Sequence, residues 1–158
     1  MKTNTIELYI HIPFCKSKCR YCDFCSFRAE EETIHAYLGK LKEELIFWGK
    51  KLAARDVVTV FIGGGTPSYL RREDIQMICE TIFEHFHICE DAEITIEANP
   101  GTVDLKKLCT YRENGINRIS FGLQSTVKEE LEYLGRIHTY EQFLQCYNWA
   151  REAGFCNI

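Results

Sequence analysis

Four of the nine cysteines lie within eleven residues near the start of the chain, at Cys15, Cys19, Cys22 and Cys25. The first three have the spacing C-x3-C-x2-C, and they follow a short apolar segment, residues 8–10, that predicts a β-strand. The cysteines therefore lie on a loop at the carboxyl end of a strand. Parallel α/β folds usually place their chemistry at that end.

Three thiolates on one short loop favour an iron–sulfur cluster. Each can hold one iron of a [4Fe-4S] cube, whereas electron-transfer clusters use four cysteines. The fourth iron would stay open to a small molecule such as S-adenosylmethionine, which chelates metal through its amino and carboxylate groups. The alternative is a structural zinc ion held by all four cysteines, although such sites usually pair two separated knuckles. The remaining cysteines are scattered and are expected to be small core residues: Cys79, Cys89, Cys109, Cys146 and Cys156.

Length, composition and charge limit the classes of function. The 158 residues are 46% hydrophobic and 13% aromatic, which is enough for one domain with a substantial core. The net charge of −4 is scattered along the chain and offers no basic stripe for phosphates, so we expect no nucleic-acid partner. The chain starts with a strand and has no apolar run of membrane-spanning length, so we expect a cytoplasmic protein.

The spacing of apolar residues predicts alternating strands and helices. Strands are expected at residues 8–10, 57–62, 93–98 and 116–123, and helices at residues 34–52, 75–86, 105–115, 127–134 and 140–153. The continuous apolar run at 57–62 is typical of a strand buried on both faces of a parallel sheet. Residues 155–158 have the composition of the first residues of a fifth strand.

This alternation predicts an α/β fold, namely a partial (β/α) barrel of the TIM type that stops after about four β/α units. Residues 1–158 would then be the N-terminal part of a barrel domain, with the C-terminal half of the barrel and any C-terminal domain absent. A half-barrel leaves its last strand edge and part of its inner face without a partner. We therefore expect a fragment, or a partner that supplies the missing half.

Five motifs, in the same order along residues 7–158, closely resemble those of radical SAM proteins. They are YIHIPFC with the following cysteines (9–22), FIGGGTPS (61–68), EANPGT (97–102), NRISFGLQS (117–125) and LGRIH (134–138). Within this superfamily the chain is similar to the oxygen-independent coproporphyrinogen III oxidase-like family, on its haem chaperone (HemW) branch. The resemblance implies a [4Fe-4S] cluster on Cys15, Cys19 and Cys22, with S-adenosylmethionine on the open iron.

The resemblance also implies contacts to S-adenosylmethionine. The glycine triplet that contains Gly64 would bring backbone groups to the methionine amino group, and Tyr9 and Glu97 match further contacts of that molecule. Five residues match positions that the oxidase branch uses for a second S-adenosylmethionine: Tyr21, Gly65, Thr66, Gln124 and Arg136. Without the resemblance, the triplet is an ordinary turn, Glu97 is an exposed strand-end carboxylate and Arg136 is a solvated surface cation.

One departure distinguishes the two branches of the family. The oxidase branch has a further cysteine two residues after the third ligand, but here that position is Phe24, and Cys25 follows it. This favours a haem chaperone, which binds and transfers haem, although the His-Asn-x-x-Tyr-Trp segment associated with haem in that branch lies outside these residues. The alternatives are oxidative decarboxylation of coproporphyrinogen III and a truncated product with little function.

The implied partners follow from the resemblance alone. They are haem or a porphyrinogen, an electron donor such as flavodoxin or ferredoxin, and a protein that accepts haem. The two histidines in the motifs, His11 and His138, are expected to be hydrogen-bonded structural residues rather than haem ligands.

Overall fold

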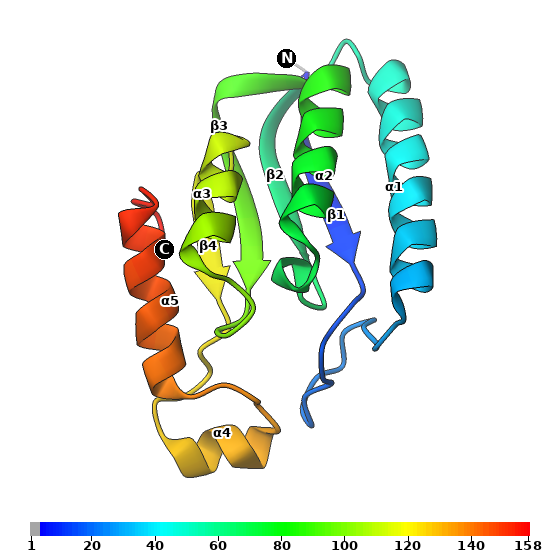
Figure 1. Ribbon diagram of the computed structural model, residues 1–158. Helices are drawn as coiled ribbons and strands as arrows, with labels where there is room; N and C mark the ends of the chain where they lie inside the picture. Colours follow the sequence, from blue (N-terminus) through cyan, green and yellow to red (C-terminus); the bar gives the residue numbers. More distant parts are fainter. Residues whose placement is uncertain (1–3) are drawn as a thin grey trace.

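The computed structural model describes residues 4–158, which form one parallel sheet with a row of helices across it (Figure 1). The strands pair in sequence order, and they are β1 (Thr5–Ile12), β2 (Asp56–Gly64), β3 (His87–Ala98) and β4 (Arg118–Phe121). The helices are α1 (Glu31–Lys51), α2 (Arg72–His85), α3 (Leu105–Glu113), α4 (Lys128–Leu134) and α5 (Tyr140–Glu152), with a 3-10 helix η1 (Pro67–Tyr69) after β2. The expected α/β alternation is confirmed.

The two faces of the sheet differ in character because side chains alternate along each strand. The face toward the helices is apolar, and Ile12, Ile62 and Ile96 are fully buried there. The opposite face carries polar side chains such as Glu93 and Arg118. Helices α1, α2, α3 and α5 therefore cover one face (Figure 1). β2 is not buried on both faces as its apolar run predicted, since Thr59 and Phe61 remain partly exposed.

Several strand boundaries differ from the sequence expectation, and β1 already runs over Thr5–Ile12 rather than residues 8–10. β3 begins at His87 rather than Glu93, through a stretch of mixed polarity that carries no strand pattern. β4 is shorter than expected, and Asn117 before it contacts β3 through its side chain as well as its backbone: its Oδ1 accepts from Ile94 N at 2.8 Å and its Nδ2 donates to Ala92 O at 2.7 Å. The expected fifth strand is represented by one parallel bridge between Asn157 and Arg118.

All carboxyl ends of the strands meet at one edge of the sheet, where the arrowheads point in Figure 1. Four segments leave the strands at this edge: residues 13–27 after β1 (the cysteine loop), residues 63–66 at the end of β2 (the glycine turn), residues 99–104 after β3 and residues 122–127 after β4. No helix among residues 4–158 combines the length and apolar character needed to cross a membrane.

Candidate functional site

A cavity of about 320 Å³ opens at the carboxyl edge of the sheet and is lined by segments from all four strands. This volume is within the range of small-molecule sites. Ten of the eleven residues assigned from the sequence line it: Cys15, Cys19, Tyr21, Cys22, Gly64, Gly65, Thr66, Glu97, Gln124 and Arg136. The exposed Cys25 is not among the lining residues. The three spaced cysteines thus face the same cavity as the proposed ligand contacts, and the fourth cysteine does not.

Tyr9 is the one assigned residue outside the cavity lining. Its side chain lies on the open face of the sheet, stacked on Phe61 with 6.1 Å between ring centroids. Burial raises the pKa of Tyr9, and the neighbouring carboxylate of Glu97 raises it further. Tyr9 therefore lies beside the cavity, on the side where Glu97 enters it.

His11 connects Tyr9 to the cysteine loop. The His11 Nε2 atom lies 2.9 Å from the carbonyl oxygen of Cys25 and its Nδ1 atom lies 3.0 Å from the Tyr9 hydroxyl. Because a carbonyl oxygen only accepts, Nε2 carries the proton and Nδ1 accepts from Tyr9. His138 is also hydrogen-bonded, through Nε2 to the carbonyl of Leu123 at 3.1 Å. Both histidines are therefore hydrogen-bonded within the fold.

The glycine turn lies against the start of the cysteine loop. Gly65 N donates to Ile12 O and Thr66 N donates to Phe14 O, both at 2.8 Å. A Cβ atom on Gly65 would lie 2.8 Å from Phe14 O and 3.0 Å from Cys15 Sγ, closer than side chains pack. Gly64 has φ +114°, a conformation that favours glycine, and its N–H donates to Glu97 Oε2 at 3.0 Å. The turn therefore brings Glu97 and Cys15 to the same wall of the cavity.

The cysteine loop is folded by its own polar contacts. Cys15 N donates to Phe27 O at 3.0 Å, which closes the loop at its base. Inside it, Lys18 Nζ donates to the carbonyl oxygens of Phe24 at 2.9 Å and Ser26 at 3.1 Å. These contacts give the cysteines a defined arrangement on a segment without regular secondary structure.

Each of the three cavity cysteines has a polar neighbour at its sulfur. Thr66 Oγ1 lies 3.4 Å from Cys15 Sγ, and Arg136 Nη1 lies 3.4 Å from Cys19 Sγ. The hydroxyl of Ser26 lies 3.9 Å from Cys22 Sγ. Hydrogen bonds of this kind accompany thiolates that bind iron–sulfur clusters.

The donor set at the cavity is compatible with an iron–sulfur cluster. Cys15, Cys19 and Cys22 all line the cavity, and each sulfur has a polar neighbour. In a [4Fe-4S] cube each thiolate binds a different iron, so three thiolates leave one iron for another ligand.

Arg136 is held inside the site by two strand ends. Its Nη2 atom donates to Asn99 Oδ1 and to Gly122 O, both at 2.6 Å, and its Nε atom is buried without a hydrogen-bond partner. Arg136 is therefore not the solvated surface cation of the alternative interpretation. Burial raises the pKa of Tyr21, and the charge of Arg136 beside it opposes that shift.

Gln124 shows backbone strain at the cavity. It has φ +67°, and within residues 4–158 it is the one residue other than glycine with a positive φ. This left-handed conformation costs about 1–2 kcal/mol for a residue with a side chain. Strain of this kind is found at functional sites, where the surrounding structure holds the residue in place.

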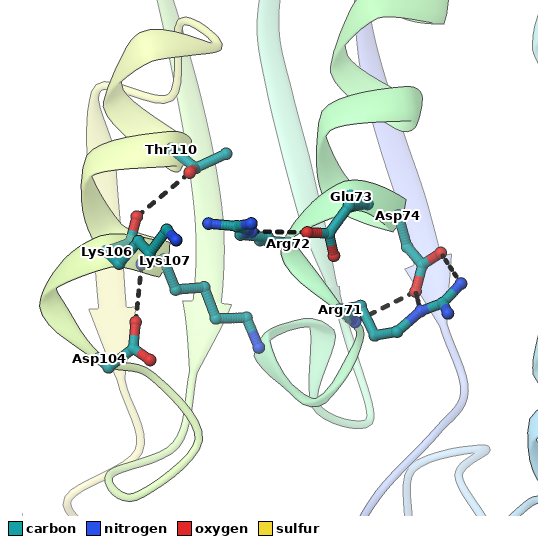
Figure 2. Close-up of polar contacts among 8 residues, drawn as sticks. All are labelled: Arg71, Arg72, Glu73, Asp74, Asp104, Lys106, Lys107 and Thr110. Atoms are coloured by element: carbon teal, nitrogen blue, oxygen red, sulfur yellow. Dashed lines mark hydrogen bonds and ion pairs between the residues drawn. The ribbon is translucent and has the colours of Figure 1, made fainter.

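Two residues to which the sequence assigns no role are Asn99, which lines the cavity, and Lys107, which lies outside its lining. The side chain of Asn99 contacts both Thr66 and Arg136. Lys107 reaches from the first turn of α3 toward the segment after β2 (Figure 2), and its Nζ donates to Ser68 O at 2.6 Å and Thr102 O at 3.2 Å. Burial lowers the pKa of Lys107 to about 8, although the carboxylate of Asp104 opposes the shift. The EANPGT motif (97–102) marks the segment that contains Asn99 but not the role of its side chain, and Lys107 lies in none of the five motifs. Both roles depend on segments that meet only in the fold.

This fold and this site define a class of protein. The chain belongs to the radical SAM superfamily, whose family model matches residues 9–158. The haem chaperone HemW of Bacillus subtilis is 38% identical over 151 residues, which cover 95% of this chain, and HemW of Escherichia coli is 44% identical over 139 residues, which cover 87%. The oxygen-independent coproporphyrinogen III oxidase of Escherichia coli is 35% identical over 152 residues, covering 95% of this chain. The resemblance to the HemW branch is confirmed.

The solved structures agree with this assignment. Coproporphyrinogen III oxidase (HemN) from Escherichia coli superposes with a TM-score of 0.90 at 34% identity, and the match covers 98% of this chain and 36% of that one. Methylornithine synthase (PylB) shares the fold alone, with a TM-score of 0.55 at 19% identity over 98% of this chain and 44% of that one. The chain spans 40% of the Bacillus protein, 37% of the Escherichia coli HemW and 33% of the oxidase.

Proposed function

We propose that residues 1–158 are the N-terminal part of a radical SAM core domain in a HemW-like haem chaperone, and that they bind a [4Fe-4S] cluster and S-adenosylmethionine. The observation that carries the proposal is the shared cavity, which the three cysteines line together with seven other residues assigned from the sequence, at the ends of four strands. The superfamily supplies the cofactor pair, and the HemW relatives supply the connection to haem.

In this proposal Cys15, Cys19 and Cys22 each bind one iron, and the cavity holds the S-adenosylmethionine that completes the cluster. When bound, the cluster supplies the electron that cleaves the sulfonium of S-adenosylmethionine. Glu97, oriented by Gly64 N–H through Oε2, accepts hydrogen bonds from the ligand. The backbone of the glycine turn approaches the methionine amino group. Further contacts come from Tyr9, Tyr21, Gly65, Thr66, Gln124 and Arg136.

Phe24 favours the chaperone over the oxidase. It lines the cavity at the position where the oxidase branch carries its additional cysteine, and its side chain is exposed. Haem binding and transfer, an electron donor such as flavodoxin or ferredoxin, and a haem-accepting protein belong to the same proposal. Identity to the oxidase of Escherichia coli keeps decarboxylation of coproporphyrinogen III as the second candidate.

The ligand assignment is tested by anaerobic reconstitution with iron and sulfide. Cys15→Ala, Cys19→Ala and Cys22→Ala are each expected to lose the cluster, because a cube needs all three thiolates. Cys25→Ala, the matched control, should retain about four irons per chain with wild-type visible absorption. One bound zinc without sulfide, or loss of the cluster in Cys25→Ala, would contradict the proposal.

The two candidate functions are distinguished by measuring haem binding and coproporphyrinogen III consumption. The reconstituted chain and a full-length HemW relative are measured in parallel. The chaperone predicts haem binding without consumption of coproporphyrinogen III. Consumption of coproporphyrinogen III together with release of 5′-deoxyadenosine would support the oxidase instead.

A further inference from the structure

Asn99 joins the two residues that contact Cys15 and Cys19. Its Nδ2 donates to Thr66 Oγ1 at 2.9 Å and its Oδ1 accepts from Arg136 Nη2 at 2.6 Å. Thr66 in turn reaches Cys15 Sγ, and Arg136 reaches Cys19 Sγ. One side-chain amide thus lies at the centre of a continuous chain of four hydrogen bonds between two cysteine sulfurs.

Asn99 is itself held rigidly at the end of β3. Its backbone N–H donates to Ser68 Oγ at 3.1 Å, and its carbonyl accepts from the hydroxyl of Thr102 at 2.7 Å and from the backbone N–H of Thr102 at 3.1 Å. A Cβ atom on Gly122 would lie 2.6 Å from Asn99 Oδ1 and 3.0 Å from Arg136 Nη2. The glycine therefore leaves the space in which the amide meets the guanidinium.

The chemistry of the partners fixes the direction of every bond. A guanidinium only donates, so the amide atom facing Arg136 is the oxygen, and Nδ2 must face Thr66. An amide N–H only donates, so Thr66 Oγ1 accepts it and directs its single proton to Cys15 Sγ. The two N–H groups of Arg136 Nη2 are taken by Asn99 and Gly122, which leaves Nη1 directed at Cys19 Sγ.

We propose that Asn99 is a positioning residue that directs hydrogen-bond donors onto two cluster cysteines and thereby raises the reduction potential of the cluster. The inference rests on the proposed function, since it requires a cluster on these cysteines. Donors on the sulfurs stabilise the form that carries the additional electron, because that form has more negative charge on sulfur. Removing the donors should make the cluster harder to reduce.

The test is the midpoint potential of the reconstituted cluster, followed by its visible and electron paramagnetic resonance spectra during stepwise reduction. In Asn99→Asp a carboxylate replaces the amide, so the Thr66 proton turns away from Cys15 and a negative charge lies beside the cluster. At a fixed applied potential the ratio of oxidised to reduced cluster should rise about tenfold, which is a shift of about 59 mV to more negative potential for one electron.

Three further variants separate positioning from general damage. Thr66→Val removes the donor to Cys15 and should shift the potential in the same direction, whereas Thr66→Ser keeps the hydroxyl and should retain the wild-type potential. Asn114→Asp is the charge-matched control, because Asn114 caps α3 outside the cavity lining and its side-chain amide donates to Thr110 O. The midpoint potential of its cluster should equal that of the wild type.

The outcomes distinguish the role of Asn99 from the proposed function. Asn99→Asp and Thr66→Val with full iron content and the wild-type potential would overturn the role of Asn99 and leave the proposed function intact. If Asn99→Asp binds no cluster, the inference is tested by comparing the midpoint potentials of Thr66→Val and Thr66→Ser. A wild-type chain that takes up no iron and sulfide would overturn the proposed function, and the inference with it.

Discussion

Because glycine has no Cβ atom, Gly65 allows the glycine turn and the cysteine loop to meet at the cavity. The space that a side chain would occupy is taken by Phe14 O, Ile12 O and Cys15 Sγ. Backbone oxygens cannot move aside as a flexible side chain would. The close approach of the glycine turn and the cysteine loop is therefore a property of this one residue type.

Gly65→Ala should consequently displace Cys15. We expect the free energy of unfolding to fall by about 1–3 kcal/mol through overpacking, and the iron content after reconstitution to fall as well. The matched control is Gly39→Ala in α1, where an added Cβ meets nothing within 4 Å and should stabilise the helix by up to about 1 kcal/mol. Urea unfolding and iron analysis measure both effects. Full cluster loading in Gly65→Ala would show that the turn can relax.

At the scale of elements, Lys107 connects α3 by hydrogen bonds to the segments that follow β2 and β3. Its two carbonyl partners, Ser68 and Thr102, lie on those two segments. A neutral amine still has two N–H donors, so both contacts survive deprotonation. Charging the buried amine, by contrast, has a desolvation cost, and this cost is why its pKa falls to about 8.

The lowered pKa predicts how stability depends on pH. Between pH 8 and 10.5 the unfolded chain keeps the Lys107 proton while the folded chain loses it, so the free energy of unfolding rises with pH across this window. Relative to Lys107→Met, the wild type should gain about 3 kcal/mol between these limits. The exposed neighbour Lys106, also drawn in Figure 2, is the control, and Lys106→Met should track the wild type. Urea unfolding at a series of pH values measures the difference, and a constant difference between wild type and Lys107→Met would refute the shift.

The elements were predictable from the sequence, and their polar connections were not. The order and type of the strands and long helices follow from local apolar patterns, as at β2 and α2. The cysteines, Glu97 and Gln124 could be placed at one edge because parallel strands end together. The role of Asn99 could not be predicted, since its Pro-Gly neighbours indicate only a turn and its two side-chain partners come from other strand ends. The start of β3 at His87 was missed because pairing with Asp56, rather than local pattern, extends it.

On the scale of the whole molecule, stability should be concentrated in the central strands. β2 and β3 each pair with strands on both sides, whereas β1 and β4 each border one full-length neighbour. The cysteine loop lacks regular structure, and α4 has Leu131 as its one buried residue. The molecule therefore combines a rigid sheet with loosely supported segments around the cavity.

Hydrogen exchange should report this distribution directly. Backbone amides of 58–62 and 94–98 are expected to exchange slowest, near the rate set by global unfolding, and those of 16–25 and 128–134 fastest. Reconstitution with iron and sulfide should slow exchange in 16–25 and leave 58–62 unchanged. Equal protection of the cysteine loop and the central strands in the metal-free chain would contradict this distribution.

The contact between Arg136 and Cys19 also sets an order of events during synthesis. Arg136 follows Cys19 by 117 positions, and the neighbouring Arg20 N donates to Leu134 O at 3.1 Å, so both contacts wait for the chain to reach α4. The cysteines leave the ribosome while the residues that orient them are still unmade. Iron that arrives early would meet a cysteine loop that still lacks its contacts with Leu134 and Arg136. If these cysteines bind the proposed cluster, we therefore expect its insertion to follow translation of these segments.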